Sequence, residues 1–331
     1  MHVLVTGASG FIGGRLARQL GERGDEVRCL VRDRNGIRAR GLLGEGFEVH
    51  VGDVLRPESL SGAGRGVDVA YYLVHSMGRG GNASDFAERE RRAAEGFGRM
   101  ATQEGIGRVI YLGGLGGNPR SEHLRSRHET ARQLEAHGPP LTYFRAGMVV
   151  GSESESYRTL RYLVERLPAM IAPAWLATRT QPIGIDDVLS YLSQAPHVEA
   201  STGRELQIGG PDVLTYGDML DVMALALGKR PRPKIPVPFI TPWLSSLWIG
   251  LVTPVDAGVA RPLIEGLSTE TVVTDDSARR LFDIEPAPFE ATLRQALAED
   301  KDLPAPRQGL SATPERSRHK ASRLADRVCA K

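Results

Sequence analysis

Short hydrophobic runs alternate with longer amphipathic segments through the first 150 residues of the chain. A hydrophobic run bounded by turn residues predicts a strand, whereas apolar positions three and four residues apart predict a helix. Strand and helix patterns follow one another five times, which is typical of an α/β protein with a parallel, doubly wound sheet. The predicted strands are 3–5, 26–32, 47–51, 67–74, 108–113 and 141–145.

Two long polar segments separate the later strands, and both predict helices, at about 84–103 and 122–137. The Glu and Arg residues of the first helix are interpreted as its solvent-exposed face. The strand at 67–74 is almost continuously apolar, which predicts that it is buried on both faces.

The alternation changes after Gly151. Segments 182–188 and 205–210 predict short strands that return to the sheet, and the intervening and following segments predict a smaller lobe of helices and loops. The last residues are rich in Pro, Ser, Arg and Ala, which is typical of a flexible tail. The predicted organisation is a sheet domain at 1–150 with 181–210 rejoining the sheet, a lobe at 151–300 and a tail at 301–331.

The charge of the chain is unevenly distributed. The formal net charge of the 331 residues is +2, but residues 301–331 hold eight Lys and Arg against three Asp and Glu, which leaves the first 300 residues at about −3. A nucleic-acid-binding domain needs a basic face on its folded part. The sequence therefore predicts no nucleic-acid partner.

Cysteine use and the N-terminus indicate a cytoplasmic protein. Cys29 lies in a predicted strand and Cys329 in the tail, so the two cysteines form no disulfide framework and suit a reducing compartment. The first apolar run is only a strand long and leads into a glycine turn, unlike a signal peptide.

The segment Ile235–Val255 contains no charged residue, but four prolines interrupt it. The uninterrupted apolar length is too short to span a membrane. We interpret the segment as a helix that packs on the lobe or forms the wall of a pocket for a lipophilic substrate. A patch that associates weakly with a membrane surface is the alternative.

The first strand leads into a glycine turn of the form GxxGxxG. In a strand–turn–helix unit, Gly7 allows the sharp turn, Gly10 lets a pyrophosphate approach the backbone, and Gly13 lets the helix pack closely on the strand. The amides and the dipole at the start of the helix then favour an anionic group. This pattern predicts a dinucleotide-binding site, and the absence of a following Lys-Ser/Thr pair excludes a P-loop.

The end of the second strand indicates which dinucleotide is bound. An acidic residue about 20 positions after the glycine turn binds the ribose hydroxyl of NAD, whereas an arginine suits the 2′-phosphate of NADP. Arg32 occupies this position and Arg34 lies nearby, so NADP is favoured over NAD. The alternative is a solvated charge cluster. Asp53, after the third strand, is either an adenine contact or a turn aspartate.

The motifs together resemble the atypical short-chain dehydrogenase/reductase superfamily, over roughly residues 1–300. The nearest branch contains NAD(P)H-binding proteins related to NmrA-type regulators and to the Rossmann-fold accessory subunit of respiratory complex I. The motifs are Thr6-Gly-Ala-Ser-Gly-Phe-Ile-Gly13, Leu30-Val-Arg-Asp33, Tyr72-Leu-Val-His-Ser-Met-Gly78, Arg145-Ala-Gly147 and Ile208-Gly-Gly-Pro211.

The resemblance implies a Rossmann fold with a dinucleotide along the carboxyl edge of the sheet and a substrate between the sheet and the lobe. The implied contacts are Gly7, Ala8, Ser9, Gly10, Phe11, Ile12 and Gly13 at the diphosphate, Arg32 at the 2′-phosphate, Asp53 and Val54 at the adenine, Leu73, Val74 and His75 along the cofactor, and Ala146, Gly147 and Met148 beside the nicotinamide.

The catalytic residues of active members of the superfamily are replaced in this chain. Such members use a serine after the fifth strand and a Tyr-x-x-x-Lys on the next helix. Here the serine region is Leu112-Gly-Gly-Leu115, and the matching helical spacing holds His123 and Arg127. Histidine is a competent proton donor at neutral pH, and Arg127 could hold a ribose but not act as a base. Alternatively, both are surface residues of a site that has lost its catalytic pair.

His75 and Ser76, at the carboxyl end of the fourth strand, are alternative proton donors because ligands of open α/β folds bind at that edge. No metal site is predicted. His128-Glu-Thr-Ala-Arg132 has an arginine where a zinc-protease motif needs its second histidine, and the other histidines lack ligand spacing. Ser9 is not in a GxSxG elbow, which disfavours a hydrolase.

Two function classes are therefore open. The first is an NADP-dependent oxidoreductase that reduces a carbonyl or activated double bond of a small, apolar molecule. The second is a non-catalytic dinucleotide-binding module that senses redox state or stabilises a complex. Both predict the same fold, so the fold does not choose between them. The sequence leaves the oligomeric state open.

Overall fold

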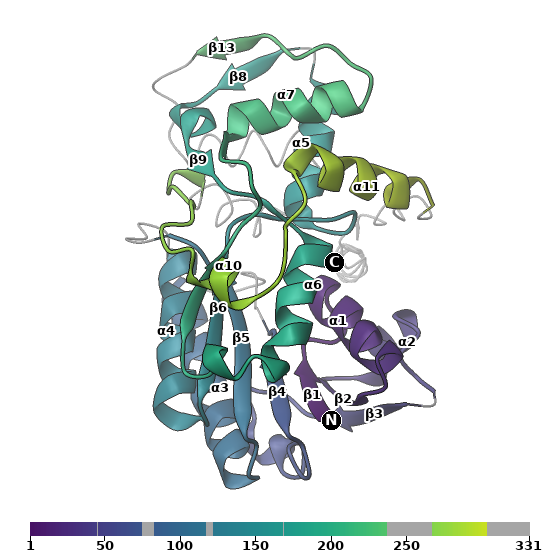
Figure 1. The fold of residues 1–331 in the computed structure, drawn as a ribbon, viewed down its shortest axis with the longest axis vertical. Helices are drawn as coiled ribbons and strands as arrows, with labels where there is room; N and C mark the ends of the chain where they lie inside the picture. The colour runs from purple at the N-terminus through teal and green to yellow at the C-terminus, as the bar shows by residue number, and fades with distance from the viewer. Residues whose placement is uncertain (45, 75–82, 117–121, 168, 237–266, 303–331) are drawn as a thin grey trace, which may run out of the picture.

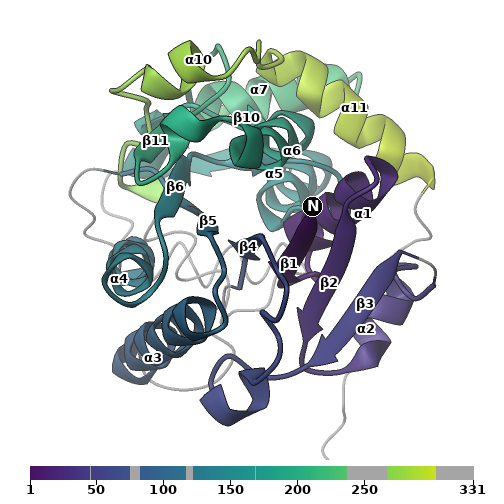
Figure 2. The same cartoon turned by 60° about the horizontal axis from the view of Figure 1, so that its bottom comes forward.

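A parallel sheet of seven strands forms the centre of the molecule (Figures 1 and 2), in the order β11-β6-β5-β4-β1-β2-β3. The computed structural model describes residues 1–302 apart from 45, 75–82, 117–121, 168 and 237–266. The first six strands have the 3-2-1-4-5-6 order of a Rossmann fold, so the predicted fold class is confirmed. The strands are β1 (His2–Thr6), β2 (Glu26–Val31), β3 (Phe47–Val51), β4 (Val69–Tyr72), β5 (Arg108–Gly114), β6 (Leu141–Ala146) and β11 (Glu205–Ile208).

Helices cover both faces of this sheet. Residues along β1 alternate between two hydrophobic cores, as the period of a strand requires. Val3 and Val5 pack with Leu16 of α1 on one face, whereas Leu4 packs with Phe97 of α3 on the other. The helices are α1 (Phe11–Glu22), the short α2 (Arg34–Ala39), α3 (Ala83–Gln103), α4 (Glu122–His137) and α6 (Ile185–Gln194). α3 packs against α4, and α1 packs against α6.

The prediction that segment 182–188 returns to the central sheet is wrong. Ile183–Gly184 form the short strand β10, which pairs with β7 (Val149–Val150), and helix α6 begins at the next residue. Two acidic residues lie in the first turn of α6, where carboxylates interact favourably with the helix dipole. The segment therefore contains the start of a helix. The strand expected at 205–210 does lie in the sheet, as β11.

A lobe with its own hydrophobic core, whose buried residues lie from Val150 onward, is above the sheet in Figure 1. Tyr157 and Leu163 of α5, Met219 of α7 and Leu293 of α11 are buried in this core. The elements of the lobe are α5 (Glu155–Arg166), β8 (Met170–Ala172), β9 (Arg179–Thr180), β12 (Leu214–Thr215), α7 (Tyr216–Ala226), β13 (Lys234–Pro236) and α11 (Phe289–Asp302). The short helix α10 (Ser277–Leu281) packs instead against β11 of the sheet. The 3-10 helices among the described residues are Pro57–Leu60, Ala174–Ala177, Ala195–His197 and Glu199–Ser201.

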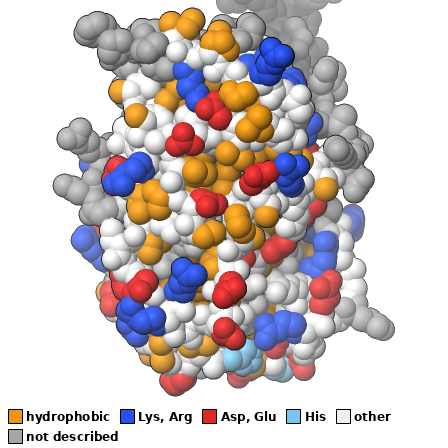
Figure 3. Space-filling model, turned by 45° about the horizontal axis from the view of Figure 1, so that its top comes forward, with side chains coloured by type: hydrophobic (Ala, Val, Ile, Leu, Met, Phe, Trp, Pro, Cys, Tyr) orange, Lys and Arg blue, Asp and Glu red, His pale blue; other side chains and the backbone are white. Residues whose placement is uncertain are grey.

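Two sequence predictions fall mainly outside the described residues. These are the apolar segment Ile235–Val255, of which only the first two residues belong to β13, and the basic tail from 303 onward. Among the described residues, no helix has the length and hydrophobicity needed to cross a membrane. On the face shown in Figure 3, basic and acidic side chains are interspersed with hydrophobic ones.

Candidate functional site

The glycine turn between β1 and α1 is packed so closely that side chains at two of its positions would collide with backbone. Gly7 has a φ of +67°, and a Cβ on it would lie 2.5 Å from the carbonyl oxygen of Leu73. A Cβ on Gly13 would lie 2.4 Å from the carbonyl oxygen of Gly7. The buried Thr6 hydroxyl donates to the Tyr71 carbonyl and accepts from the Leu73 amide, which fixes the turn to the end of β4.

Helix α1 begins without a side-chain cap. The preceding Gly10 is extended, and its amide donates to the Gly7 carbonyl at 2.8 Å. The first amides of a helix have no partner within the helix, so those that begin α1 are available to an anionic ligand. Ala8 is fully buried, and the side chains of Phe11 and Ile12 pack against the core. The backbone of this turn is therefore the part that can hold a diphosphate.

A cleft of about 400 Å³ lies beside the turn, at the carboxyl ends of β1 to β4 and against α3. This volume is within the range of small-molecule and cofactor sites. Eight residues proposed from the sequence line it: Gly7, Ser9, Gly10, Arg32, Asp53, Val54, Leu73 and Val74. The cleft is therefore built where the motif and the strand ends predict it.

Arg32 lines the cleft directly after β2 and is exposed. Within the described part of the chain its guanidinium forms no hydrogen bond or ion pair. The neighbouring Asp33 caps α2, because its carboxylate accepts from the amides of Asn35 at 2.8 Å and Gly36 at 3.4 Å. Arg34 is the first residue of α2 and does not line the cleft. At the end of the cleft next to β2, Arg32 therefore carries a charge that has no partner among the described residues.

Asp53 lines the cleft and also stabilises a turn, so the turn interpretation fits its contacts, while a contact with the adenine stays a prediction. Its carboxylate accepts from the Leu55 amide at 3.0 Å and lies 3.8 Å from Arg56. The Asp53 amide donates to the Ser59 hydroxyl at 2.8 Å.

One wall of the cleft was missed by sequence reasoning. Phe86, Arg89, Glu90 and Ala93 of α3 line it, together with Tyr72 of β4. Their spacing of three and four residues places them on one helix face, which is the signal that could have identified them. Glu90 is only 7% exposed, so the interpretation of the α3 charges as a solvated face is wrong there. Burial, followed by Glu90, raises the pKa of Tyr72, which keeps its phenol protonated.

The three residues expected beside a nicotinamide do not line this cleft. Ala146 ends β6 and is buried, and Met148 packs against the core of the lobe. A Cβ on Gly147 would lie 2.6 Å from the carbonyl oxygen of Gln181, so glycine is needed where these two chain segments cross. The three residues therefore lead from the end of β6 toward the core of the lobe.

The comparisons with known proteins agree with this geometry. A model of the NAD(P)H-binding family matches residues 7–161, which contain the glycine turn and most of the cleft. The protein named NADH dehydrogenase (ubiquinone) 1 alpha subcomplex subunit 9, mitochondrial, from Arabidopsis thaliana is 24% identical over 289 residues, which cover 83% of this chain and 71% of that protein. Residues 7–161 therefore match the NAD(P)H-binding family, and these similarities support the predicted relation of the chain to the atypical short-chain dehydrogenase/reductase superfamily.

Two further proteins resemble this chain over a shorter stretch or in the fold alone. Sanguinarine reductase from Eschscholzia californica is 37% identical over 81 residues, which cover 24% of this chain and 29% of that protein. The NADPH-dependent quinone oxidoreductase of Escherichia coli, solved with NADPH, superposes with a TM-score of 0.69 at 15% identity, covering 90% of this chain and 99% of that one. This second similarity shows the fold.

The helix that carries the catalytic pair in active short-chain reductases is α4 here. Arg127 is half-buried on α4, and its Cδ lies 3.6 Å from the place of a Cβ on Gly114, so it lies against the carboxyl end of β5. The side chain of His123 and residues 75 and 76 lie outside what the structure describes.

His128, on the same helix, contacts a backbone carbonyl and an arginine side chain. Its Nε2 lies 3.2 Å from the Gly116 carbonyl oxygen and 3.3 Å from Arg145. Burial and then the Arg145 guanidinium lower the pKa of His128, so its imidazole is neutral at pH 7. The half-motif that starts at His128 is explained by these contacts with the loop after β5.

Proposed function

We propose that this chain is an NADP(H)-dependent oxidoreductase that reduces a small, apolar carbonyl compound or enone. The observation that carries the choice of NADP is the open guanidinium of Arg32 in the cleft beside the glycine turn. An arginine at this position complements the 2′-phosphate, which NAD lacks. Asp33 does not line the cleft, and its Oδ1 accepts from the amides that begin α2, so its carboxylate is oriented toward the helix and not toward the ribose site.

Calorimetric titration with NADPH and NADH tests this preference. Wild type should bind NADPH more tightly, and Arg32→Asp should lower the affinity for NADPH by about tenfold or more, since a hydrogen bond to a charged group contributes about 1.5–3 kcal/mol. Arg38→Asp is the matched control, because it makes the same change in charge at an exposed arginine of α2 that does not line the cleft. Equal affinities of wild type for the two nucleotides would contradict the assignment of Arg32.

The proposed reaction needs a hydride and a proton. When bound, the reduced nicotinamide supplies the hydride to the carbonyl carbon. We assign the proton on the new hydroxyl to His123, whose unperturbed pKa suits neutral pH, with Arg127 holding the ribose. His75 and Ser76 are the alternative donors. The position of Arg127 against the end of β5 supports this arrangement.

A screen of carbonyl and quinone compounds for NADPH oxidation tests the catalytic part of the proposal. A substrate that wild type turns over should be reduced much more slowly by His123→Ala, while NADPH still binds with the wild-type affinity. Undiminished turnover by this variant would exclude His123 and direct attention to His75 and Ser76.

A second candidate is a non-catalytic NAD(P)H-binding module. The absence of the serine and of Tyr-x-x-x-Lys supports it, as does the similarity to a complex I subunit over 83% of this chain. This candidate predicts NADPH binding without turnover of any compound in the screen. For both candidates we propose a cytoplasmic location, which is supported by the free, buried thiol of Cys29.

A further inference from the structure

We infer that Arg40 is a positioning residue that holds the glycine turn of the dinucleotide site and ties it to the lobe through Glu153. The inference rests on the proposed binding of a dinucleotide at this turn. By this inference, a residue outside the cleft couples cofactor binding to the lobe.

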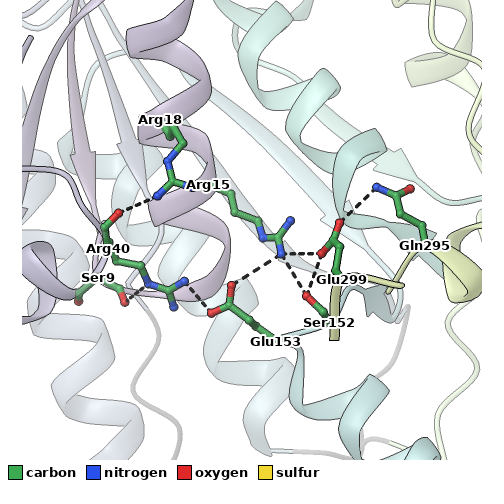
Figure 4. Close-up of polar contacts among 8 residues, drawn as sticks. All are labelled: Ser9, Arg15, Arg18, Arg40, Ser152, Glu153, Gln295 and Glu299. Atoms are coloured by element: carbon green, nitrogen blue, oxygen red, sulfur yellow. Dashed lines mark hydrogen bonds and ion pairs between the residues drawn. The ribbon is translucent and has the colours of Figure 1, made fainter. Parts of the chain in front are cut away.

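One guanidinium makes both contacts. Nε of Arg40 donates to the carbonyl oxygen of Ser9 at 3.2 Å, and Nη1 donates to Oε2 of Glu153 at 2.6 Å (Figure 4). Ser9 lies between Gly7 and Gly10 and lines the cleft, whereas Glu153 lies between β7 and α5 in the lobe. Because the guanidinium is planar and rigid, a shift of either partner changes its contact with the other.

The Arg40 side chain is held along its length. Arg18 of α1 donates to the Arg40 carbonyl oxygen at 2.7 Å, which fixes the backbone at the end of α2. The stem then crosses α1 at Gly14, where an added Cβ would lie 3.2 Å from Cδ of Arg40. The side chains of Arg40 and Glu153 are each 25% exposed, so water screens their ion pair less than it screens a surface pair.

A second arginine joins the same lobe residues but does not contact the turn. Nη2 of Arg15 donates to Glu299 at 2.8 Å and to the Ser152 hydroxyl at 3.1 Å, and it lies 3.7 Å from Glu153 (Figure 4). Removing the charge of Glu153 therefore breaks the link through Arg40 and leaves Arg15 paired with Glu299. Removing the charge of Glu299 breaks its pair with Arg15 and leaves the link through Arg40 intact, so Glu299→Gln is a matched control.

The link implies a reciprocal effect. If a dinucleotide binds more tightly to the turn when Arg40 and Glu153 are paired, then its binding must stabilise the lobe position in which they pair, by the same free energy. Arg40 acts at the turn and not at the 2′-phosphate, so the effect should be equal for NADPH and NADH. This equality distinguishes Arg40 from Arg32.

The test is titration of the full chain with NADPH and with NADH, for wild type, Arg40→Ala, Arg40→Lys, Glu153→Gln and Glu299→Gln. We expect Arg40→Ala to weaken both nucleotides by about tenfold and Glu153→Gln by severalfold, with Arg40→Lys intermediate because lysine keeps one point contact. Glu299→Gln should stay within about twofold of wild type. Hydrogen–deuterium exchange supplies the second readout. NADPH should slow exchange at residues 153–160 in wild type but not in Glu153→Gln at saturating nucleotide.

The outcomes separate the two proposals. Wild-type affinities in Arg40→Ala and Glu153→Gln would overturn this inference but not the proposed function. So would protection from exchange on NADPH binding that is as strong in Glu153→Gln as in wild type. A loss confined to NADPH would overturn it by showing that Arg40 acts on the 2′-phosphate. Failure of wild type to bind either nucleotide would overturn the proposed function and this inference together.

Discussion

Arg32 and Asp33 are adjacent residues with separate tasks. Asp33 satisfies two amides at the start of α2, while Arg32 faces the cleft without a partner among the described residues. The sequence could predict the place of Arg32, because the distance from a glycine turn to the end of the next strand is nearly fixed in a Rossmann fold. The sequence could not predict that Asp33 caps α2, since an aspartate at this position can either cap a helix or contact a ligand.

Substitutions in the glycine turn should lower the free energy of unfolding by amounts that depend on the position. An alanine Cβ at Gly13 would lie 2.4 Å from a backbone oxygen, whereas one at Gly10 would lie 3.1 Å from it. Since backbone has little freedom to move away, we expect Gly13→Ala to lower the free energy of unfolding by about 1–3 kcal/mol and Gly10→Ala by less. Urea unfolding of both variants measures the difference. An equal loss in the two variants would contradict the close packing of α1 on the turn.

At the level of elements, the sequence predicted helices better than the ends of short strands. The helix at 122–137 was predicted with its observed bounds, because a long periodic segment leaves few alternatives. The short apolar segment at 182–188 fits either a strand or the start of a helix. Its two acidic residues favour the helix, because carboxylates in the first turn interact favourably with the helix dipole. The α3 wall of the cleft depends on how that helix rotates against the sheet, which charge runs alone do not specify.

The cap of α2 gives a prediction at this level. Replacing Asp33 by Ala removes the acceptor for two amides, so we expect a loss of about 1 kcal/mol in the free energy of unfolding. Asp33→Asn keeps an acceptor oxygen and should lose less. The preference for NADPH over NADH should survive in both variants, which calorimetry can measure together with thermal unfolding. A loss of the preference in Asp33→Asn would assign Asp33 to the nucleotide.

For the whole molecule, the sheet follows from local patterns but its junction with the lobe does not. Arg40 and Glu153 are 113 positions apart, and Arg15 and Glu299 are 284 apart. No periodicity or spacing relates residues at such distances, so only the folded chain brings them together. The predicted division into domains remains a prediction, although the lobe has a separate hydrophobic core.

The junction should weaken in acid. Burial acts to raise the pKa of Glu299, but the hydrogen bonds from Arg15 and Ser152 outweigh it and hold that pKa below the ordinary value of 4.5. A carboxyl with a lowered folded-state pKa contributes stability above its unfolded-state pKa and loses it as the pH falls through the folded-state value. The stability difference between wild type and Glu299→Gln should therefore be full at pH 7 and shrink below about pH 4.5.

Thermal unfolding of the two proteins from pH 3 to pH 8 measures this effect. Arg294 and Glu290 form an exposed pair within α11, so Glu290→Gln is the control and should change stability little at any pH. A difference between wild type and Glu299→Gln that stays constant down to pH 3 would contradict the pairing of Glu299 with Arg15.

A crystal structure of the full chain grown with NADPH tests most directly whether the cleft is a dinucleotide site. We predict that the diphosphate contacts the amides that begin α1, between the Gly7–Gly10 turn and Leu73, and that the 2′-phosphate contacts the Arg32 guanidinium. A nucleotide bound elsewhere, or a cleft that stays empty at saturating NADPH, would contradict the proposal.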